Sequence, residues 1–284
     1  ITTGDSNVAI GYQAGDAIST GSGNVVMGHG AFSAEDTGSN HVAIGKSALA
    51  VLNIGGSSNV AVGLNALTAN VSGGNNTAIG TNTLAAQNTS GSAADTHNTA
   101  VGNAAGAAVT TGCENTFVGS IAGDGTDDGI GNTAMGFATL SANCGNSNTA
   151  IGSVALTATT GADNTALGFA AGVAVTSGSN NLFLGHDAGR TGSPGGNFTT
   201  DANRIVLGDD NIGECHIQVD WTVASDQRDK TDFTVLDLGL DFVKALAPVT
   251  YKWDKRSKYG DKHADDYDLN AQSPDGTHKE DWLD

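Results

Sequence analysis

Ser225 and Lys230, five residues apart near the end of the chain, are a pair whose side chains could support covalent chemistry. A serine hydroxyl is a weak nucleophile until a neighbouring base takes its proton, and a lysine can act as that base only when burial lowers its pKa. The spacing alone is a weak signal, because a serine in an exposed turn and a solvated lysine would show it too. The elements around the pair must decide between these two interpretations.

An acidic segment, residues 124–129, could offer carboxylate and carbonyl oxygens to Ca²⁺. It matches neither an EF-hand loop nor the nonapeptide calcium roll, so we interpret it as an acidic corner loop. Three histidines, His29, His41 and His186, occur singly without a partner at ligand spacing and are expected to be structural. We therefore expect no metal and no cofactor.

The cysteines Cys113, Cys144 and Cys215 are odd in number and far apart. They form no C-x-x-C pair of the kind used for zinc or for a disulfide framework. We expect three small thiols that are buried or half-buried.

Most of the chain consists of about twelve copies of one repeat, read most clearly as Asn-Val/Thr-Ala-Ile-Gly. The copies begin 16 to 18 residues apart, with two spacings of 22. Aligned on Asn, with one His as the exception, they begin at Asn7, Asn24, His41, Asn59, Asn76, Asn98, Asn115, Asn132, Asn148, Asn164, Asn181 and Asn203. Self-similarity at such a period is typical of a solenoid, so the sequence predicts an all-β fold.

Each repeat has an aliphatic residue or Met before its Gly, usually Val or Thr two positions earlier, and usually Ala between them. Successive residues of a strand point to opposite sides. We expect the aliphatic residue to face the interior of the coil, so that the Ala side needs another surface to pack on. One coil supplies little core to offset the entropy cost of ordering its backbone. This predicts a homotrimer assembled around the Ala face.

Asn side chains stacked in successive coils are expected to form ladders, and Gly is expected to permit the corners. At about 4.8 Å per coil, twelve coils would form a rod of about 58 Å.

The chain is acidic, with 30 Asp and Glu against 12 Lys and Arg. Nucleic acids and anionic lipids bind through clustered Lys and Arg, so we exclude both as primary partners. No run of about 18 apolar residues occurs, so we expect no membrane insertion. Because the chain starts at Ile1, just before a repeat, we expect it to be part of a longer product.

The unit Asn-Val-Ala-Ile-Gly, with Gly-x-x-Ala-Leu after it and Gly-x-x before the next Asn, resembles the head repeats of trimeric autotransporter adhesins. Similar repeats occur in bacteriophage tail fibres, and the resemblance covers roughly residues 4–210. It implies a left-handed parallel β-roll trimer. The repeat here is longer than the adhesin unit of about 14 residues.

After Gly208 the repeat stops. The motif Ser-Asp-x-Arg-x-Lys at residues 225–230 leads into an expected short helix around Leu236–Leu246, which Pro248 ends. A strand is expected over Val249–Trp253.

This arrangement, over about residues 222–254, resembles the intramolecular chaperone domain of endosialidases and phage tail fibres. The resemblance implies a domain that trimerises the fibre and then releases itself by cutting after the motif serine. It places the scissile bond at Ser225–Asp226, with Ser225 as nucleophile and Lys230 as its base.

We therefore predict an all-β, trimeric, left-handed parallel β-solenoid shaft with a small α+β segment at the C-terminus. The expected divisions are a shaft over residues 1–213, a connector over 214–224 and the start of a chaperone-like domain over 225–284. The predicted function is that of a structural virion protein, a tail fibre or spike that contributes to host attachment. Its expected partners are two further copies of itself, other tail or baseplate proteins, and a host cell-surface receptor or polysaccharide.

Two other functions remain open. The first is the head of an adhesin on the outer surface of a Gram-negative bacterium. The second is a solenoid polysaccharide depolymerase, which would need paired carboxylates and usually a groove lined by aromatic residues. Aromatic residues make up only 5% of the chain, which disfavours the depolymerase.

Two further features bear on recognition. The longer repeats carry extra residues over 87–96 and 190–201, which are expected to protrude and could contact a host receptor. Six repeats have Thr where others have Val, as in ice-binding solenoids, but we expect these hydroxyls to face the core, which disfavours ice binding.

Overall fold

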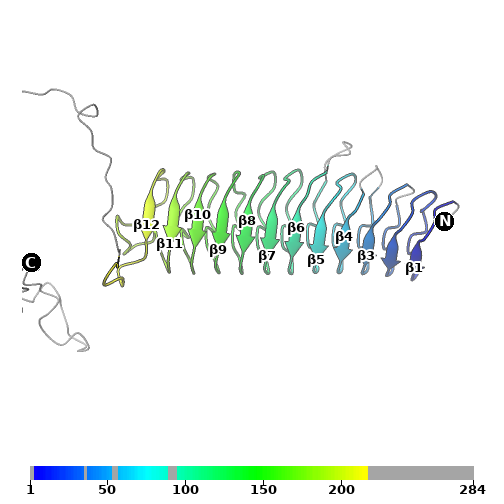
Figure 1. Ribbon diagram of the computed structural model, residues 1–284, viewed down its shortest axis with the longest axis horizontal. Helices are drawn as coiled ribbons and strands as arrows, with labels where there is room; N and C mark the ends of the chain where they lie inside the picture. Colours follow the sequence, from blue (N-terminus) through cyan, green and yellow to red (C-terminus); the bar gives the residue numbers. More distant parts are fainter. Residues whose placement is uncertain (1–2, 35–36, 53–56, 89–94, 217–284) are drawn as a thin grey trace, which may run out of the picture. The chain divides into compact units, whose positions relative to one another are not determined.

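The computed structural model describes residues 3–34, 37–52, 57–88 and 95–216 (Figure 1). The chain divides into two units, Ile1–His216 and Ile217–Asp284, and every described residue belongs to the first. The described ranges contain no helix, which confirms the all-β prediction. Their twelve strands are β1 Val8–Ile10, β2 Val25–Met27, β3 Val42–Ile44, β4 Val60–Val62, β5 Thr77–Ile79, β6 Thr99–Val101, β7 Thr116–Val118, β8 Thr133–Met135, β9 Thr149–Ile151, β10 Thr165–Leu167, β11 Leu182–Leu184 and β12 Ile205–Leu207.

All twelve strands belong to one parallel sheet whose order follows the chain (Figure 1). Each coil contributes one strand, and equivalent residues pair with one another, as Ala134 does with Ala150. Because the register never slips, each position of the repeat forms a straight column along the molecule. This is the predicted β-solenoid.

The middle residue of each strand faces the interior of its coil. Ala43, Ala61 and Ala78 are fully buried, whereas outer residues such as Ile79 and Leu167 are 40% and 50% exposed. The expected orientation, with the aliphatic residues inside and Ala outside, is therefore wrong. The structure also turns the Thr column outward, so the expectation that its hydroxyls face the core is wrong as well.

The physical reason is that a second set of side chains fills the coil from the opposite side. Leu49, Leu67 and Leu156 lie four residues after the Gly of their coils and are fully buried. Their backbones adopt left-handed φ angles of 53°, 51° and 48°. A bulky residue rarely adopts a left-handed backbone conformation. Here that conformation directs the leucine side chain into the interior of the coil, beneath the strand. Only a small residue then fits beneath the sheet.

In two coils the large side chain lies at the middle strand position and the small residue at the leucine position. Phe117 and Phe183 occupy the middle strand position and are fully buried. The leucine position of the same coils is then Gly, and a Cβ at Gly123 would lie 2.5 Å from the Phe117 ring. A Cβ at Gly189 would lie 2.4 Å from the Phe183 ring. The core thus keeps its volume by exchanging Ala and Leu for Phe and Gly.

The Asn column forms the predicted ladder, mostly through bonds from side chain to backbone. Oδ1 of Asn98 accepts the N–H of Asn115 at 2.9 Å, and Nδ2 of Asn98 donates to the carbonyl of Gly112 at 2.8 Å. At His41, which replaces Asn in the third coil, Nδ1 accepts the N–H of Asn59 at 3.2 Å. These amides are fully buried, and the bonds satisfy the backbone of the next coil.

In the last coil, Arg204 and not Asn203 occupies the ladder position. The N–H of Arg204 donates to Oδ1 of Asn181 at 3.0 Å. Asn203 lies one position earlier, with a left-handed φ of 61°, where Asn180 lies in the preceding coil. The alignment of the last repeat on Asn203 is therefore wrong by one residue.

Candidate functional site: the outer strand face and its C-terminal end

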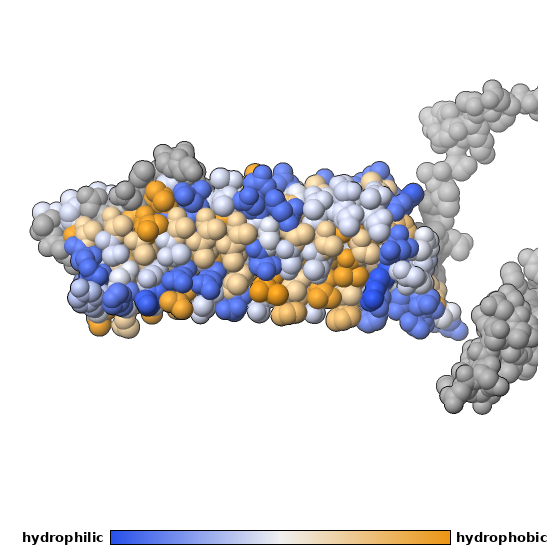
Figure 2. Space-filling view, turned by 180° about the vertical axis from the view of Figure 1, so that it is seen from behind, coloured by the Kyte–Doolittle hydropathy of each residue, from blue (hydrophilic) through white to orange (hydrophobic). Residues whose placement is uncertain are grey.

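The outer face of the sheet consists of the first and third residues of the twelve strands. No strand contains a charged residue, and the third residue of each strand is aliphatic or Met. Several of these side chains are well exposed, among them Ile10, Met135, Leu167 and Ile205. On the side shown in Figure 2, by contrast, hydrophobic residues lie in separate patches between hydrophilic ones. A long, uncharged apolar strip on a soluble surface is typical of an interaction site.

A groove of about 370 Å³ lies along the strand starts of the last three coils. One wall is formed by the first residues of β10, β11 and β12, which are Thr165, Leu182 and Ile205. The polar lining comes from the residues just before these strands: Asp163, Asn180, Asn181, Asn203 and Arg204. Ile205 is 68% exposed, and the groove carries an apolar wall together with one carboxylate, Asp163, and one guanidinium, Arg204.

The opposite border of the strand face carries aromatic rings. Phe169 follows β10 by two residues, is 50% exposed and stacks on His186 with ring centroids 5.3 Å apart. At the other end of the solenoid, Tyr12 and His29 stack in the same way at 5.2 Å. Histidines in this column are thus stacked along the solenoid axis, in agreement with the structural role predicted for them.

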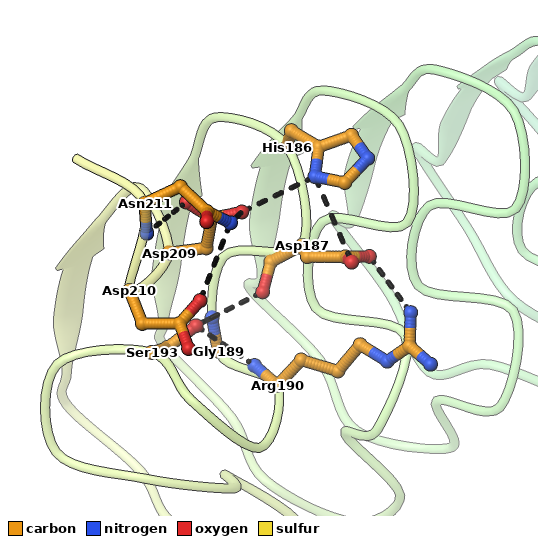
Figure 3. Close-up of polar contacts among 8 residues, drawn as sticks. All are labelled: His186, Asp187, Gly189, Arg190, Ser193, Asp209, Asp210 and Asn211. Atoms are coloured by element: carbon orange, nitrogen blue, oxygen red, sulfur yellow. Dashed lines mark hydrogen bonds and ion pairs between the residues drawn. The ribbon is translucent and has the colours of Figure 1, made fainter. Parts of the chain in front are cut away.

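His186 also belongs to a polar cluster at the C-terminal end (Figure 3). Its Nδ1 lies 3.3 Å from Oδ2 of Asp209 and 3.6 Å from Oδ2 of Asp187. Nη1 of Arg190 lies 2.9 Å from Oδ1 of Asp187. The His186–Asp209 contact joins the eleventh and twelfth coils, beyond the ladder between their backbones, whereas the other two contacts lie within the eleventh coil.

The Asp209 carboxylate is stabilised in its ionised form. The side chain of Asn211 donates to it at 3.1 Å and the backbone N–H of Asn211 at 3.0 Å. These two bonds, with a smaller contribution from His186, lower the pKa of Asp209 below its ordinary value. The border that carries Phe169 therefore ends in a carboxylate whose ionised form is stabilised by hydrogen bonds.

Ser193 lies close to this histidine and these carboxylates, but its bonds exclude a nucleophilic role. Its Oγ donates to the backbone carbonyl of Asp187 at 2.9 Å and accepts the N–H groups of Gly189 and Arg190 at 2.9 and 3.2 Å. The proton of the hydroxyl is therefore held by a carbonyl and not by a base. The cluster therefore has a structural role at the end of the solenoid.

The insertion over residues 190–201 protrudes only in part: residues 190–192 and 194–195 are exposed, whereas its second half is anchored on the solenoid. Phe198 is 9% exposed and packs edge to face on Phe183 at 6.1 Å. Its N–H donates to the carbonyl of Gly189 at 3.0 Å. The ring covers the apolar core of the last coils, and no periodicity in the sequence could have indicated this. In the other insertion, residues 89–94 lie outside the described residues, while Gln87 is buried and accepts a bond from Asn98 at 2.7 Å.

The cysteines differ in exposure. Cys113 is half-buried and Cys144 is buried beside the Thr126 hydroxyl, 3.3 Å away, whereas Cys215 is exposed. The prediction of a buried or half-buried thiol is therefore wrong for Cys215. Burial raises the pKa of the Cys113 and Cys144 thiols, and the charge of Glu114 adds to this at Cys113.

The described residues contain no group of three or more His, Cys, Asp or Glu side chains that could hold a metal ion. In the acidic corner loop over residues 124–129, the Thr110 hydroxyl donates to Oδ1 of Asp127, and Asn143 accepts the N–H of Asp127. These bonds join the loop to neighbouring coils.

Ser225 and Lys230, with the scissile bond at Ser225–Asp226, lie outside the described residues. So do the helix and strand predicted after them. Among the residues that the structure describes, no helix is long and apolar enough to cross a membrane.

Comparison with known proteins gives one match, and it falls on this C-terminal segment. Residues 225–272 match the family described as chaperone of endosialidase. No curated protein and no solved structure matches the chain. The family match begins at Ser225, the residue at which the sequence motif places the cleavage.

Proposed function

We propose that this chain is part of a virion tail fibre or spike: a trimeric β-solenoid shaft followed by a folding domain that cuts itself off after assembly. The observation that carries the proposal is the order of the parts. A solenoid with an exposed apolar face is followed directly by a segment that matches the chaperone of endosialidase family. A shaft of this kind contributes to host attachment, with other tail or baseplate proteins and a host receptor or polysaccharide as partners.

The exposed strand face supports the trimer. A homotrimer was expected around the Ala column, but that column lies inside the coil. The outer aliphatic column is the surface that needs cover, because several of its residues are well exposed and no charge interrupts it. Burying such a strip between copies contributes roughly 25 cal/mol per Å² of apolar surface.

Self-cleavage is tested on the full chain by mass spectrometry. Hydrolysis of the Ser225–Asp226 bond gives two fragments whose masses add up to the chain plus one water. We expect these fragments from the parent chain and an intact Ser225→Ala variant, because the nucleophile is lost. Lys230→Ala should also stay intact, because the serine then lacks its base.

The matched control is Ser257→Ala, which changes another serine of the same segment. It should be cut like the parent chain. Identical intact masses for the parent and Ser225→Ala would refute self-cleavage and leave the proposed shaft unaffected.

A second candidate is the head of a bacterial surface adhesin, which the repeat motif favours. The two candidates differ in what surrounds the repeats in the parent gene. An adhesin gene encodes a coiled-coil stalk and a membrane anchor after the head, whereas the proposed fibre gene encodes the rest of the chaperone domain. The complete reading frame therefore separates them.

A further inference from the structure

The groove at the strand starts and the exposed ring of Phe169 lie at opposite borders of one face. Asp163 and Asn180 come two residues before β10 and β11, whereas Phe169 comes two residues after β10 ends. All strands run in the same direction and in register, so strand starts form one border and strand ends the other (Figure 1). The two features also lie in the same coils, the last three.

The two borders are complementary in charge and in polarity. The groove holds Arg204, whose nearest carboxylate, Asp201, is 4.0 Å away. The strand-end border carries the Asp209 carboxylate, which accepts two hydrogen bonds from Asn211, and the half-exposed Phe169 ring. The strand-start border thus offers an apolar wall and the Arg204 guanidinium, with Asp163 further along the groove, and the strand-end border offers an apolar ring and the Asp209 carboxylate.

Cyclic symmetry brings these borders together. In a closed ring of three solenoids about an axis parallel to their length, the interface is heterologous: one border of each copy meets the other border of the next. A pure rotation keeps each coil at its own height. The border that ends β10 in one copy therefore lies beside the border that begins β10 in its neighbour.

We propose that the groove of each copy receives Phe169 of the neighbouring copy, and that Arg204 pairs there with the neighbour's Asp209. This contact rests on the trimer of the proposed function and specifies its geometry. The ring lies beside Thr165, the groove residue of its own coil, and reaches Leu182 one coil further along. The groove is complete only when the second copy is present. Six strand-start positions of the central coils carry Thr, whereas Leu182 and Ile205 give this end a larger apolar wall. The contact therefore fixes the register at the C-terminal end of the shaft.

The test is disulfide cross-linking in the full chain. Cys113 and Cys215 are first changed to Ser and the buried Cys144 to Ala, so that only introduced thiols can pair. One chain then carries both Phe169→Cys and Leu182→Cys. The two positions lie at opposite borders of the face, so oxidation should link neighbouring copies and give covalent dimers and closed trimers on a denaturing gel.

Three control chains accompany this pair. Each single-cysteine chain should stay monomeric on the gel, because a heterologous contact does not bring a position next to itself. The third control combines Leu182→Cys with Ala158→Cys, an exposed position that lies in the turn after the ninth coil's Gly. It should cross-link much less than the Phe169 pair.

Light scattering on the same samples separates this proposal from the proposed function. A trimeric mass together with strong linkage of the Phe169 pair supports both. A trimeric mass without linkage, or with equal linkage of the Ala158 pair, overturns the proposed contact and leaves the trimer standing. A monomeric mass overturns the trimer and the contact with it.

Discussion

At Phe117 an aromatic ring occupies a place that a methyl group fills in most other coils. The ring is accommodated because Gly123 and Gly106, in its own coil and the preceding one, leave it space. The side chains of one coil are therefore chosen together, and a change at one position alters what its partner position can hold.

A double-mutant cycle tests this coupling. Phe117→Ala should cost about 3–5 kcal/mol because it leaves a cavity, and Gly123→Leu should cost about 3 kcal/mol because the new side chain meets the ring. Combined, the two changes recreate the Ala and Leu of the ordinary coil, so the double variant should lose less stability than the two single losses added together. Urea unfolding at equal protein concentration measures all four chains.

A simple sum of the two single effects would contradict the coupling. The matched control pairs Phe117→Ala with Gly189→Leu, a glycine that faces Phe183 and not Phe117. In that pair the losses should add.

At the scale of single residues, the sequence predicted which residues form columns along the solenoid, but not which columns face the interior of the coil. Alternation along a strand separates inside from outside only when one side is polar, and in Val-Ala-Ile both sides are apolar. The misplacement of Asn203 has a similar cause, because Asn also suits the left-handed position just before the ladder.

At the scale of elements, the insertion over residues 190–201 acts as a cap for the end of the solenoid. The core of a solenoid is open at its ends, and terminal units need to cover it. Phe198 supplies that cover, and Ser193 holds the start of the insertion through three hydrogen bonds. The 22-residue spacing predicted an insertion here, but its fold depends on a contact between Phe198 and Phe183 that no local pattern encodes.

Phe198→Ala should therefore loosen the last coils without affecting the middle of the shaft. We expect faster hydrogen exchange at backbone amides of β11 and β12, and unchanged exchange at β5 and β6, because each coil contacts only its neighbours. Thr191→Ala, an exposed position in the same insertion, serves as control and should leave both regions unchanged. Equal acceleration along the whole shaft would show that Phe198 is not a local cap.

At the scale of the whole molecule, the exposed strand face determines the proposed assembly. The sequence predicted the solenoid, because a repeat of this period leaves few alternatives. It also predicted the chaperone segment that the family comparison matches, from a motif of six residues and the pattern after it. It predicted an apolar surface without cover, but assigned that surface to the Ala column, which the structure buries inside the coil.

Ile79→Asp tests the assembly at the middle of the face. It would bury a carboxylate between copies, which costs several kcal/mol per charge without a partner. In a Ser225→Ala background, which keeps the chain intact, we expect the mass from light scattering to fall from three times 28.3 kDa to the mass of a single chain. Ala158→Asp adds the same charge at an exposed position off the strand face and should keep the parent mass. A trimeric Ile79→Asp variant would exclude this face as the interface.

The Asn ladder has a consequence for how the shaft carries load. Its bonds, like those of the sheet, run from coil to coil along the axis, in the direction in which a solenoid held at both ends would be pulled. Tension along that axis loads the bonds of one coil boundary at a time, so a solenoid yields by peeling and not by shearing. Each coil of about 17 residues would then release roughly 55–60 Å of chain. Under sudden pull, such a shaft would lengthen in steps and absorb energy while its remaining coils keep their fold.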